Sequence, residues 1–574
     1  MCDEKNPFLA KNHVIMCVND PKEMASHFKW YPASEEIVVP WNARYAFPSQ
    51  ANKAVKMTPR IPPKSGQVFA PGNIIRIEFP AQGYVNPLNT TLEFDVAILQ
   101  PTAAADTRYS LRFQNNIQSI FQRVRLLYGA TPIEDILNYN VIVRALTEWT
   151  STNQAGTMDQ TSISEGIGGY VDGTDQGPST VYQGRVSTRQ KYIHGIEVSN
   201  ASGTGIGTAN LTGGGTAGLV PNSDVAGIQG LAQGTVGCTR RYQINFALGL
   251  FTQDKLIPVK FMASQLAIEI TLEAVAACMV CTVGAGSLTT LPDYRVGNIN
   301  LIPEILEFDS SYDAMFLRGL REGGVPIKFS SWHTFFFNSA RSSNINLQVQ
   351  ERSRSVKALF AVQRLPQPNL YRDNGALLFD TASSTEGSTL QQYQFRIGGR
   401  YFPASPVQTS FSTGAAVSNG GAEAFVELQK ALNCVGDYRL STSCNTVRWA
   451  VGTAPAANDE AGLRGAANWF DHAVQIYDYD ATGRPLMKSS ISSTNSFVAT
   501  TGSMCFAMAI DLETSNGMEI SGLNAEEQSD IALLAQWSAS QQTGADATAS
   551  ALEVYSFYDA MIVLRENNVL ELIQ

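Results

Sequence analysis

The run Ile74-Ile-Arg-Ile-Glu-Phe79 alternates apolar and charged side chains. In an extended chain, the isoleucines at 75 and 77 and the phenylalanine at 79 lie on one side, and the arginine and glutamate lie on the other. This period of two is typical of a β-strand with one buried face. The alternation recurs in both halves of the chain, at residues 92–98, 242–250, 266–272, 345–349, 393–397 and 504–512. Many short strands with polar outer faces predict antiparallel sandwiches.

The strands fall into two halves. At 574 residues and 62.2 kDa the chain is long for one domain, and two cores of roughly 200 to 250 residues suit β-sandwiches. The alternation restarts beyond residue 325, after Gly323 and Gly324, which are typical of a helix end. We therefore predict an all-β protein with a few short helices: an N-terminal arm at 1–66, a first sandwich at 67–309, a helical linker at 310–324 and a second sandwich at 325–574.

Three short helices are predicted between the strands. Thr131, Pro132 and Glu134 have the spacing of a capping box with proline at the first helical position, which predicts a helix running to about Trp149. Ser310 or Ser311 is expected to cap the linker helix. A third helix is predicted in the second half, at 422–432.

Residues 151–237 differ from the rest of the first half because Gly, Ser and Thr dominate them. A segment of this length is too long for a hairpin turn. We expect a large insertion between strands, folded on the outside of the first sandwich or ordered by a neighbouring subunit.

Charge is scarce and unevenly distributed. Only 16% of residues are charged and the formal net charge is −10, so bulk electrostatics do not favour nucleic-acid binding by the body of the protein. The end of the arm is basic, and no acidic residue lies between Arg44 and Arg76. This arm is a candidate for contact with the genome or an acidic partner; the alternative is a solvated, extended segment. Its candidate residues are Arg44, Lys53, Lys56, Arg60 and Lys64.

The sequence also predicts where the protein is made. The most apolar run, 274–283, is about half the roughly 20 residues of a spanning helix, and the N-terminus lacks the layout of a signal peptide. Eight cysteines show no framework spacing, which is consistent with reduced thiols. We expect a protein made and kept inside the cell rather than secreted.

No group of residues forms a convincing catalytic, cofactor or metal site. The five histidines, at 13, 27, 194, 333 and 472, are far apart in the sequence, and His333 is expected to be a packed strand residue. Cys278 and Cys281 form a C-x-x-C pair without a second pair, so small strand residues are the favoured interpretation over zinc or redox chemistry. The sequence therefore predicts a protein that is not an enzyme and has no cofactor or small-molecule substrate.

Three segments together resemble a known family. They are Phe69-Ala-Pro-Gly-Asn-Ile-Ile-Arg-Ile-Glu-Phe-Pro80, the strand and helix predicted at 117–149, and Phe395-Arg-Ile-Gly-Gly-Arg-Tyr-Phe-Pro-Ala404. Their order along the chain is similar to that of double jelly-roll major capsid proteins of double-stranded DNA viruses, the polinton-like virus and virophage group most of all. The resemblance covers nearly the whole chain in layout. It rests on strand openings rather than on ligand motifs.

The resemblance implies two consecutive eight-stranded jelly rolls and a structural role in a virion. Three copies would form a pseudo-hexagonal capsomer that tiles an icosahedral shell, in contact with neighbouring capsomers and with minor capsid or penton proteins. The insertion at 151–237 would supply outward loops. The arm would lie at the base, near the genome or an inner layer, and assembly would take place inside the host cell.

Two alternatives belong to other classes. A minor capsid or spike protein usually has a single jelly roll, which the two halves disfavour. A carbohydrate-binding or hydrolytic β-sandwich protein would need an acid-bearing cleft, and we would expect a secretory signal, which the sequence lacks.

Overall fold

A computed structural model describes residues 54–99, 108–113, 117–150, 164, 195–199, 236–285, 293–339, 344–364, 384–385, 388–409, 422–434, 477–479, 485–487, 506–513, 520–526, 530–537, 550–565 and 570–574. All of them belong to the compact unit 54–574. The predictions for Arg44, Lys53 and His13, 27, 194 and 472 lie outside the described residues, as does most of the 151–237 insertion.

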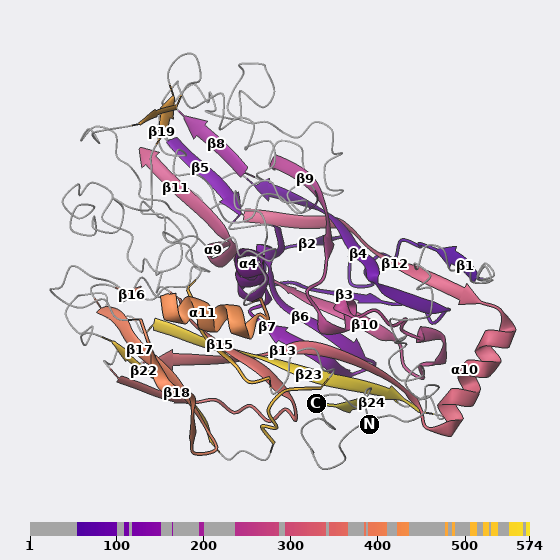
Figure 1. Ribbon diagram of the computed structural model, residues 1–574. Helices are drawn as coiled ribbons and strands as arrows, with labels where there is room; N and C mark the ends of the chain where they lie inside the picture. The colour runs from indigo at the N-terminus through magenta and orange to yellow at the C-terminus, as the bar shows by residue number, and fades with distance from the viewer. Residues whose placement is uncertain are drawn as a thin grey trace, which may run out of the picture. The chain divides into compact units, whose positions relative to one another are not determined.

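The first half contains two antiparallel sheets (Figure 1). One has the order β2-β12-β4-β9. Strand β1 also pairs with β12, at a different part of that strand from β2. The other has the order β3-β10-β6-β7. The strands are β1 (Ala54–Met57), β2 (Val68–Phe69), β3 (Ile74–Glu78), β4 (Tyr84–Leu99), β6 (Phe121–Tyr128), β7 (Thr131–Leu137), β9 (Val236–Asn245), β10 (Leu266–Leu272) and β12 (Asp293–Phe308).

The second half repeats this arrangement. One sheet has the order β13-β23-β15-β21 and the other β14-β22-β17, with β18 pairing on β17. The strands are β13 (Val325–Ser339), β14 (Asn344–Gln348), β15 (Val356–Arg364), β17 (Ser388–Ile397), β18 (Arg400–Gln408), β21 (Met508–Asp511), β22 (Ile531–Trp537) and β23 (Ser550–Leu564). β24 (Leu570–Ile573) folds back on β23, and β16 (Ser384–Thr385) pairs with β17.

The strand order identifies the fold. In each half the eight main strands, taken in chain order, place the first, eighth, third and sixth in one sheet and the second, seventh, fourth and fifth in the other. This double Greek-key order is the jelly roll. The predicted fold class, two consecutive eight-stranded jelly rolls with few short helices, is confirmed.

A third sheet is formed by segments that connect strands of the first jelly roll. It has the order β11-β5-β8, formed by β5 (Arg108–Phe113), β8 (Gly195–Ser199) and β11 (Met279–Ala285). β8 is the only stretch of consecutive described residues wholly inside the 151–237 insertion. The short pair β19 (Tyr477–Tyr479) and β20 (Pro485–Met487) lies in the second half.

The structure confirms two of the predicted helices and corrects the start of the third. α10 (Ser310–Glu322) confirms the linker helix, although Asp309 rather than Ser310 or Ser311 is its N-cap. α11 (Ala422–Ala431) confirms the helix of the second half.

The predicted helix start at Thr131 is wrong, because 131–137 is strand β7, paired with β6. Helix α4 (Tyr139–Thr150) begins only after Asn138, whose φ of 53° turns the chain. Short helical turns occupy η2 (Ile117–Ile120), α8 (Gly249–Thr252), η5 (Val259–Phe261) and α9 (Val275–Cys278).

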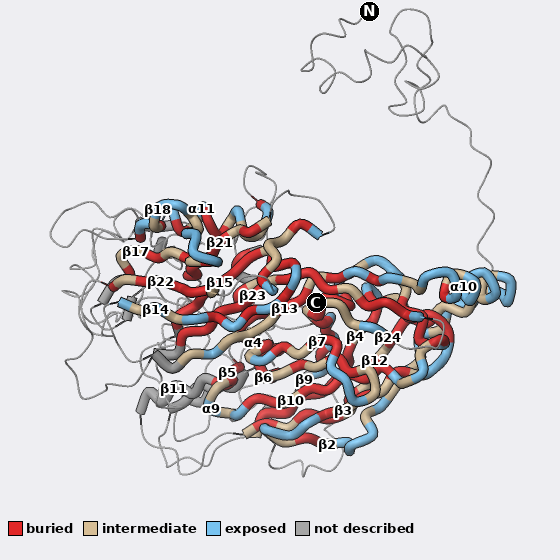
Figure 2. Tube along the Cα trace, turned by 90° about the horizontal axis from the view of Figure 1, so that it is seen from below, coloured by how far each residue is buried: buried red, intermediate tan, exposed pale blue. Residues whose placement is uncertain are grey.

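Apolar strand faces form the core, which appears as buried segments along the central strands in Figure 2. Ile75, Ile77 and Phe79 are at most 1% exposed, as their alternation predicts. Among the described residues, no helix is long and apolar enough to cross a membrane.

Replacing Phe94 with alanine tests the core assignment. Its ring is 1% exposed and packs against those of Phe121 and Tyr242, at centroid distances of 5.6 and 5.9 Å. We expect the substitution to lower the free energy of unfolding by about 3–5 kcal/mol through the cavity that it leaves, measured by denaturant unfolding. Unchanged unfolding would contradict the assignment.

Candidate functional site at the junction of the two jelly rolls

Glu134 lies at the centre of the contact between the two jelly rolls. It projects from β7 and is 1% exposed. Its carboxylate accepts hydrogen bonds from the backbone N–H groups of Gly249 and Leu250, at 2.7 and 2.8 Å, and from the hydroxyl of Ser331 on β13, at 2.5 Å. Helix α8 has no side-chain cap from its own N-cap residue, so Glu134 satisfies two of its free donors. One carboxylate therefore connects two segments of the first jelly roll to a strand of the second.

Further polar contacts continue along this junction. Asn138 donates from Nδ2 to Oε1 of the fully buried Glu553 on β23, at 2.8 Å. The hydroxyl of Thr334 on β13 donates to the carbonyl of Leu137, at 2.9 Å. Each of these bonds joins the β7–α4 segment to the second jelly roll, which fixes the register of one roll against the other.

Helix α4 contributes the apolar part of the junction, and Figure 1 shows it between the two sets of sheets. Trp149, at 2% exposed, stacks on Phe360 of β15 with a centroid distance of 5.4 Å and an interplanar angle of 19°. Trp332 packs on the same phenylalanine, at 5.5 Å. Buried aromatic contacts of this kind are typical of a permanent interface rather than a mobile one.

Gly249 marks a close backbone approach between the two jelly rolls. A Cβ atom built on this residue would lie 1.9 Å from the carbonyl oxygen of Ser330 and 2.7 Å from its carbonyl carbon. Both are backbone atoms of β13, which cannot move as a side chain can. Only glycine fits at this point.

The linker helix α10 packs against the first jelly roll. Tyr84 contacts the rings of Phe308, Tyr312 and Phe316 at centroid distances of 5.2 to 5.6 Å. Its hydroxyl donates to Asp313 at 3.1 Å. The linker is therefore part of the packed structure, although its outer face is exposed in Figure 2.

Burial sets the ionisation of the junction carboxylate. Desolvation raises the pKa of Glu134, and the hydrogen bonds from Ser331, Leu250 and Gly249 counteract it only in part. Burial therefore favours the neutral form of this acid.

A second acidic side chain, Glu351, lies beside the junction. Nδ1 of His333 is 3.3 Å from both carboxylate oxygens of Glu351, and its ring stacks on Tyr558 at 4.0 Å. His333 and Glu351 line a cavity of about 460 Å³, together with Arg123 and Asp135 of the first jelly roll. His333 is a packed strand residue, as expected, but its acidic neighbour lies 18 positions away and was not predicted.

Glu351 should make stability depend on pH in the acid range. Burial opposes its charge, but His333 and Ser353 outweigh burial and hold its pKa at about 2, against an ordinary value of 4.5. The stability contributed by Glu351 is therefore present above about pH 4.5 and is lost as the pH falls towards 2. We expect a loss of about 3 kcal/mol across this window, measured by denaturant unfolding at several pH values. The variant Glu351→Gln should lack this component, and identical pH profiles would contradict the assignment.

Three of the five predicted basic residues are described, and each lies beside an acid of the first jelly roll. Nζ of Lys56 is 2.5 Å from Glu304, Arg60 is 3.4 Å from Glu93, and Lys64 pairs with Glu78. Their segment, residues 54–66, crosses from one sheet to the other, and we call it the strap. Contact of these residues with a genome remains a prediction, because each described cation already faces a carboxylate.

The strap is also held by its backbone. β1 pairs with the end of β12. Ile61 exchanges two 2.9 Å backbone hydrogen bonds with Leu301, and the N–H of Lys64 donates to the carbonyl of Arg76 on β3, at 3.3 Å. The strap thus connects the edges of both sheets.

The described residues contain no group of three or more metal-ligating side chains. Cys278 is buried at the end of α9, and desolvation raises its pKa well above the ordinary value, so its thiol is poorly reactive. The side chain of Cys281 lies outside the described residues. Cys278 is buried, but it ends helix α9 rather than lying in a strand, so the predicted strand position of this residue is wrong.

Proteins similar to this chain are found among solved structures. No protein-family model and no curated protein matches the sequence. Three of the similar solved structures belong to viral capsids. A PBCV-1 capsid model is 10% identical over 92% of this chain and 99% of its own, with a TM-score of 0.45. The Faustovirus major capsid protein is 9% identical over 97% and 96%, at 0.45, and the mavirus major capsid protein is 8% identical over 95% and 93%, at 0.43.

The chain is thus a double jelly-roll protein on the evidence of its own strand order. Across most of its length it is structurally similar to double jelly-roll major capsid proteins. At these identities the similarity concerns the fold alone.

Proposed function

We propose that this protein is a major capsid protein, a structural subunit of the shell of a double-stranded DNA virus. The observation that carries the proposal is the junction: two complete jelly rolls are joined through buried contacts at Glu134, Gly249 and Trp149. A subunit that forms a shell in this way needs its two jelly rolls held in a fixed position relative to each other. The role is architectural rather than catalytic, and its place is the virion.

The assembly follows from the number of jelly rolls. Two similar blocks in one subunit, repeated by a three-fold axis, give a ring of six blocks, which can tile a closed shell by hexagonal packing. We therefore propose a homotrimeric capsomer that contacts neighbouring capsomers and minor capsid or penton proteins. Residues 1–53, which precede the strap, are proposed to contact an inner layer or the genome.

Light scattering behind a sizing column tests the trimer. We expect a species of three times the chain mass of 62.2 kDa, with pseudo-hexagonal particles by electron microscopy. A stable monomer would contradict the capsomer, and a monomer that binds oligosaccharides would favour the carbohydrate-binding alternative.

Two N-terminal deletions separate the strap from the residues before it. Removing residues 1–53 should leave the trimer and its unfolding midpoint unchanged while shell assembly fails. Removing 1–66 also deletes β1 and the backbone bonds of Ile61. We expect it to lower the free energy of unfolding by about 1–3 kcal/mol, measured by denaturant unfolding. Loss of the trimer in the shorter deletion would show that the arm belongs to the fold itself.

A further inference from the structure

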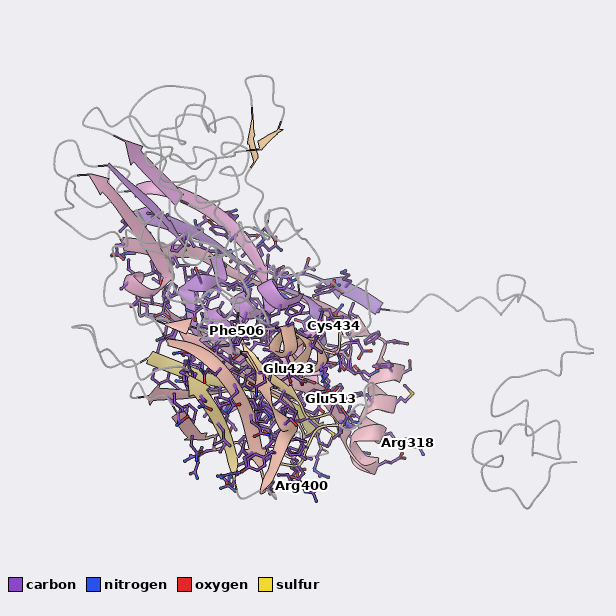
Figure 3. The ribbon with its side chains drawn as sticks, turned by 60° about the vertical axis from the view of Figure 1, so that its left-hand side comes forward. Arg318, Arg400, Glu423, Cys434, Phe506 and Glu513 are labelled. Atoms are coloured by element: carbon purple, nitrogen blue, oxygen red, sulfur yellow. The ribbon has the colours of Figure 1, made fainter. Side chains whose placement is uncertain are left out.

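Lys357 lies between two carboxylates in the second jelly roll. Its Nζ is 3.0 Å from Oε1 of Glu513 and 3.6 Å from Oδ1 of Asp559. Lys357 is on β15, Asp559 is on the adjacent strand β23, and Glu513 follows β21, the neighbour on the other side. Figure 3 labels Glu513 close to helix α11. The three side chains thus come from neighbouring strands of one sheet.

This group is far less exposed than the ion pairs of the strap. The side chains of Lys357, Glu513 and Asp559 are 19%, 4% and 8% exposed. By contrast, the side chains of Lys56 and Lys64 are 58% and 70% exposed. The ring of Phe557 lies 5.5 Å from the Lys357 ammonium. Water therefore screens the electrostatic interactions among these three side chains less than it screens the ion pairs of the strap.

Both carboxylates are held in fixed orientations. Asp559 accepts from the hydroxyls of Ser330 and Ser355, at 2.8 and 3.0 Å. Glu513 accepts from Nδ2 of Asn433 at 2.6 Å and from the hydroxyl of Ser521 at 3.0 Å. The lysine is placed by a bulge, because the register between β15 and β23 shifts between Val356 and Ala358.

We propose that Lys357 and Asp559 form an intramolecular amide bond, with Glu513 as the proton relay. Glu513 removes a proton from the ammonium, and the neutral amine attacks Cγ of Asp559. The C–N bond forms, one C–O bond of the carboxylate breaks, and the oxygen departs as water. Of the three ammonium protons, one stays on the amide nitrogen and two leave with that oxygen through Glu513. No oxidant or other reactant is required.

The surroundings supply an ionised base, hydrogen-bond donors to the acid and a fixed arrangement of the reacting groups. Burial opposes the charge of Glu513, but Asn433 and Lys357 outweigh it and hold its pKa below the ordinary value, so an ionised base faces the ammonium. Ser330 and Ser355 can stabilise the negative charge that develops on the Asp559 oxygens. Amine and acid are held on adjacent strands, which replaces a bimolecular encounter by an intramolecular one.

Lys357 and Asp559 also line a groove of about 780 Å³, through which the released water can leave. The resulting bond would connect β15 to β23 covalently, in the sheet that faces Trp149 through Phe360. Like a disulfide, it would constrain the unfolded chain. This inference does not depend on the proposed function.

Mass spectrometry of the denatured full-length protein tests the bond. We expect nearly all molecules to be lighter than the sequence mass by one water, and fragmentation to show a branched peptide joining Lys357 to Asp559. The variants Asp559→Ala and Glu513→Gln should recover the full mass. Lys255→Arg is the matched control, since Lys255 lines the same groove and lies 3.8 Å from Asp254 but is 70% exposed; it should keep the mass deficit.

Two results would overturn the proposal: full mass in the folded wild-type protein, or a deficit that persists in Asp559→Ala. The wild-type measurement remains decisive even if the variants fail to fold. The branched peptide distinguishes the amide from loss of water elsewhere in the chain.

Discussion

Replacing Gly249 with alanine should prevent the two jelly rolls from packing in register. The added Cβ would lie 1.9 Å from the carbonyl oxygen of Ser330, far inside the contact distance of any two heavy atoms. Either β13 must shift or α8 must move away and lose its bonds to Glu134. Because both are backbone segments in the buried junction, we expect a loss of at least about 4 kcal/mol in the free energy of unfolding. Soluble yield and denaturant unfolding would measure it.

Gly319→Ala is the matched control for this substitution. Gly319 lies inside helix α10, and apart from its chain neighbours and the backbone of its own helix no atom lies within 4 Å of an added Cβ. Alanine stabilises a helix interior relative to glycine by about 0.5–1 kcal/mol, so the two substitutions should act in opposite directions. Equal effects would mean that the close approach at Gly249 does not restrict the fold.

The sequence predicted what depends on local periodicity. Ile75, Ile77 and Phe79 alternate in the sequence and are buried in the structure, because a strand places alternate residues on opposite faces. The division into two halves followed from the same signal. The jelly-roll order itself came from a resemblance, since periodicity does not reveal which strands pair.

The errors arose where distant contacts decide the outcome. Thr131, Pro132 and Glu134 satisfy the pattern of a helix start, yet pairing with β6 makes this segment a strand. Glu134 does cap a helix, but the helix is α8, more than 100 positions further along the chain. No local pattern contains that partner.

The basic residues of the strap show the same limit. Their charge was visible in the sequence, but the acids that they face were not connected to them by any spacing. Glu93 and Glu304 lie on β4 and β12. A run without acidic residues therefore indicates local charge, and only the fold shows how much of it is already paired.

Replacing Glu134 with alanine should have the second large effect. The change leaves the N–H groups of Gly249 and Leu250 and the hydroxyl of Ser331 without their acceptor inside a buried junction. Breaking such a network typically costs about 3–5 kcal/mol, which we expect to see in denaturant unfolding. Glu134→Gln keeps one acceptor oxygen and the shape of the side chain, so it should lose clearly less than the alanine variant. Equal losses would show that packing, rather than hydrogen bonding, stabilises this contact.

The pH dependence separates the charge of Glu134 from its geometry. Since burial raises its pKa in the folded state, the folded protein retains this proton more strongly than the unfolded chain does. The stability associated with that proton is complete below the unfolded value and is lost as the pH rises through the folded one. Wild-type stability should therefore contain a component that declines above about pH 4.5, and Glu134→Gln, which resembles the protonated acid, should lack it.

This pH window lies on the opposite side of pH 4.5 from that of Glu351, whose pKa is lowered, so the two carboxylates can be assigned separately in one series of measurements. If the wild type and the glutamine variant showed the same slope above pH 4.5, the buried carboxylate would not be the source of the decline.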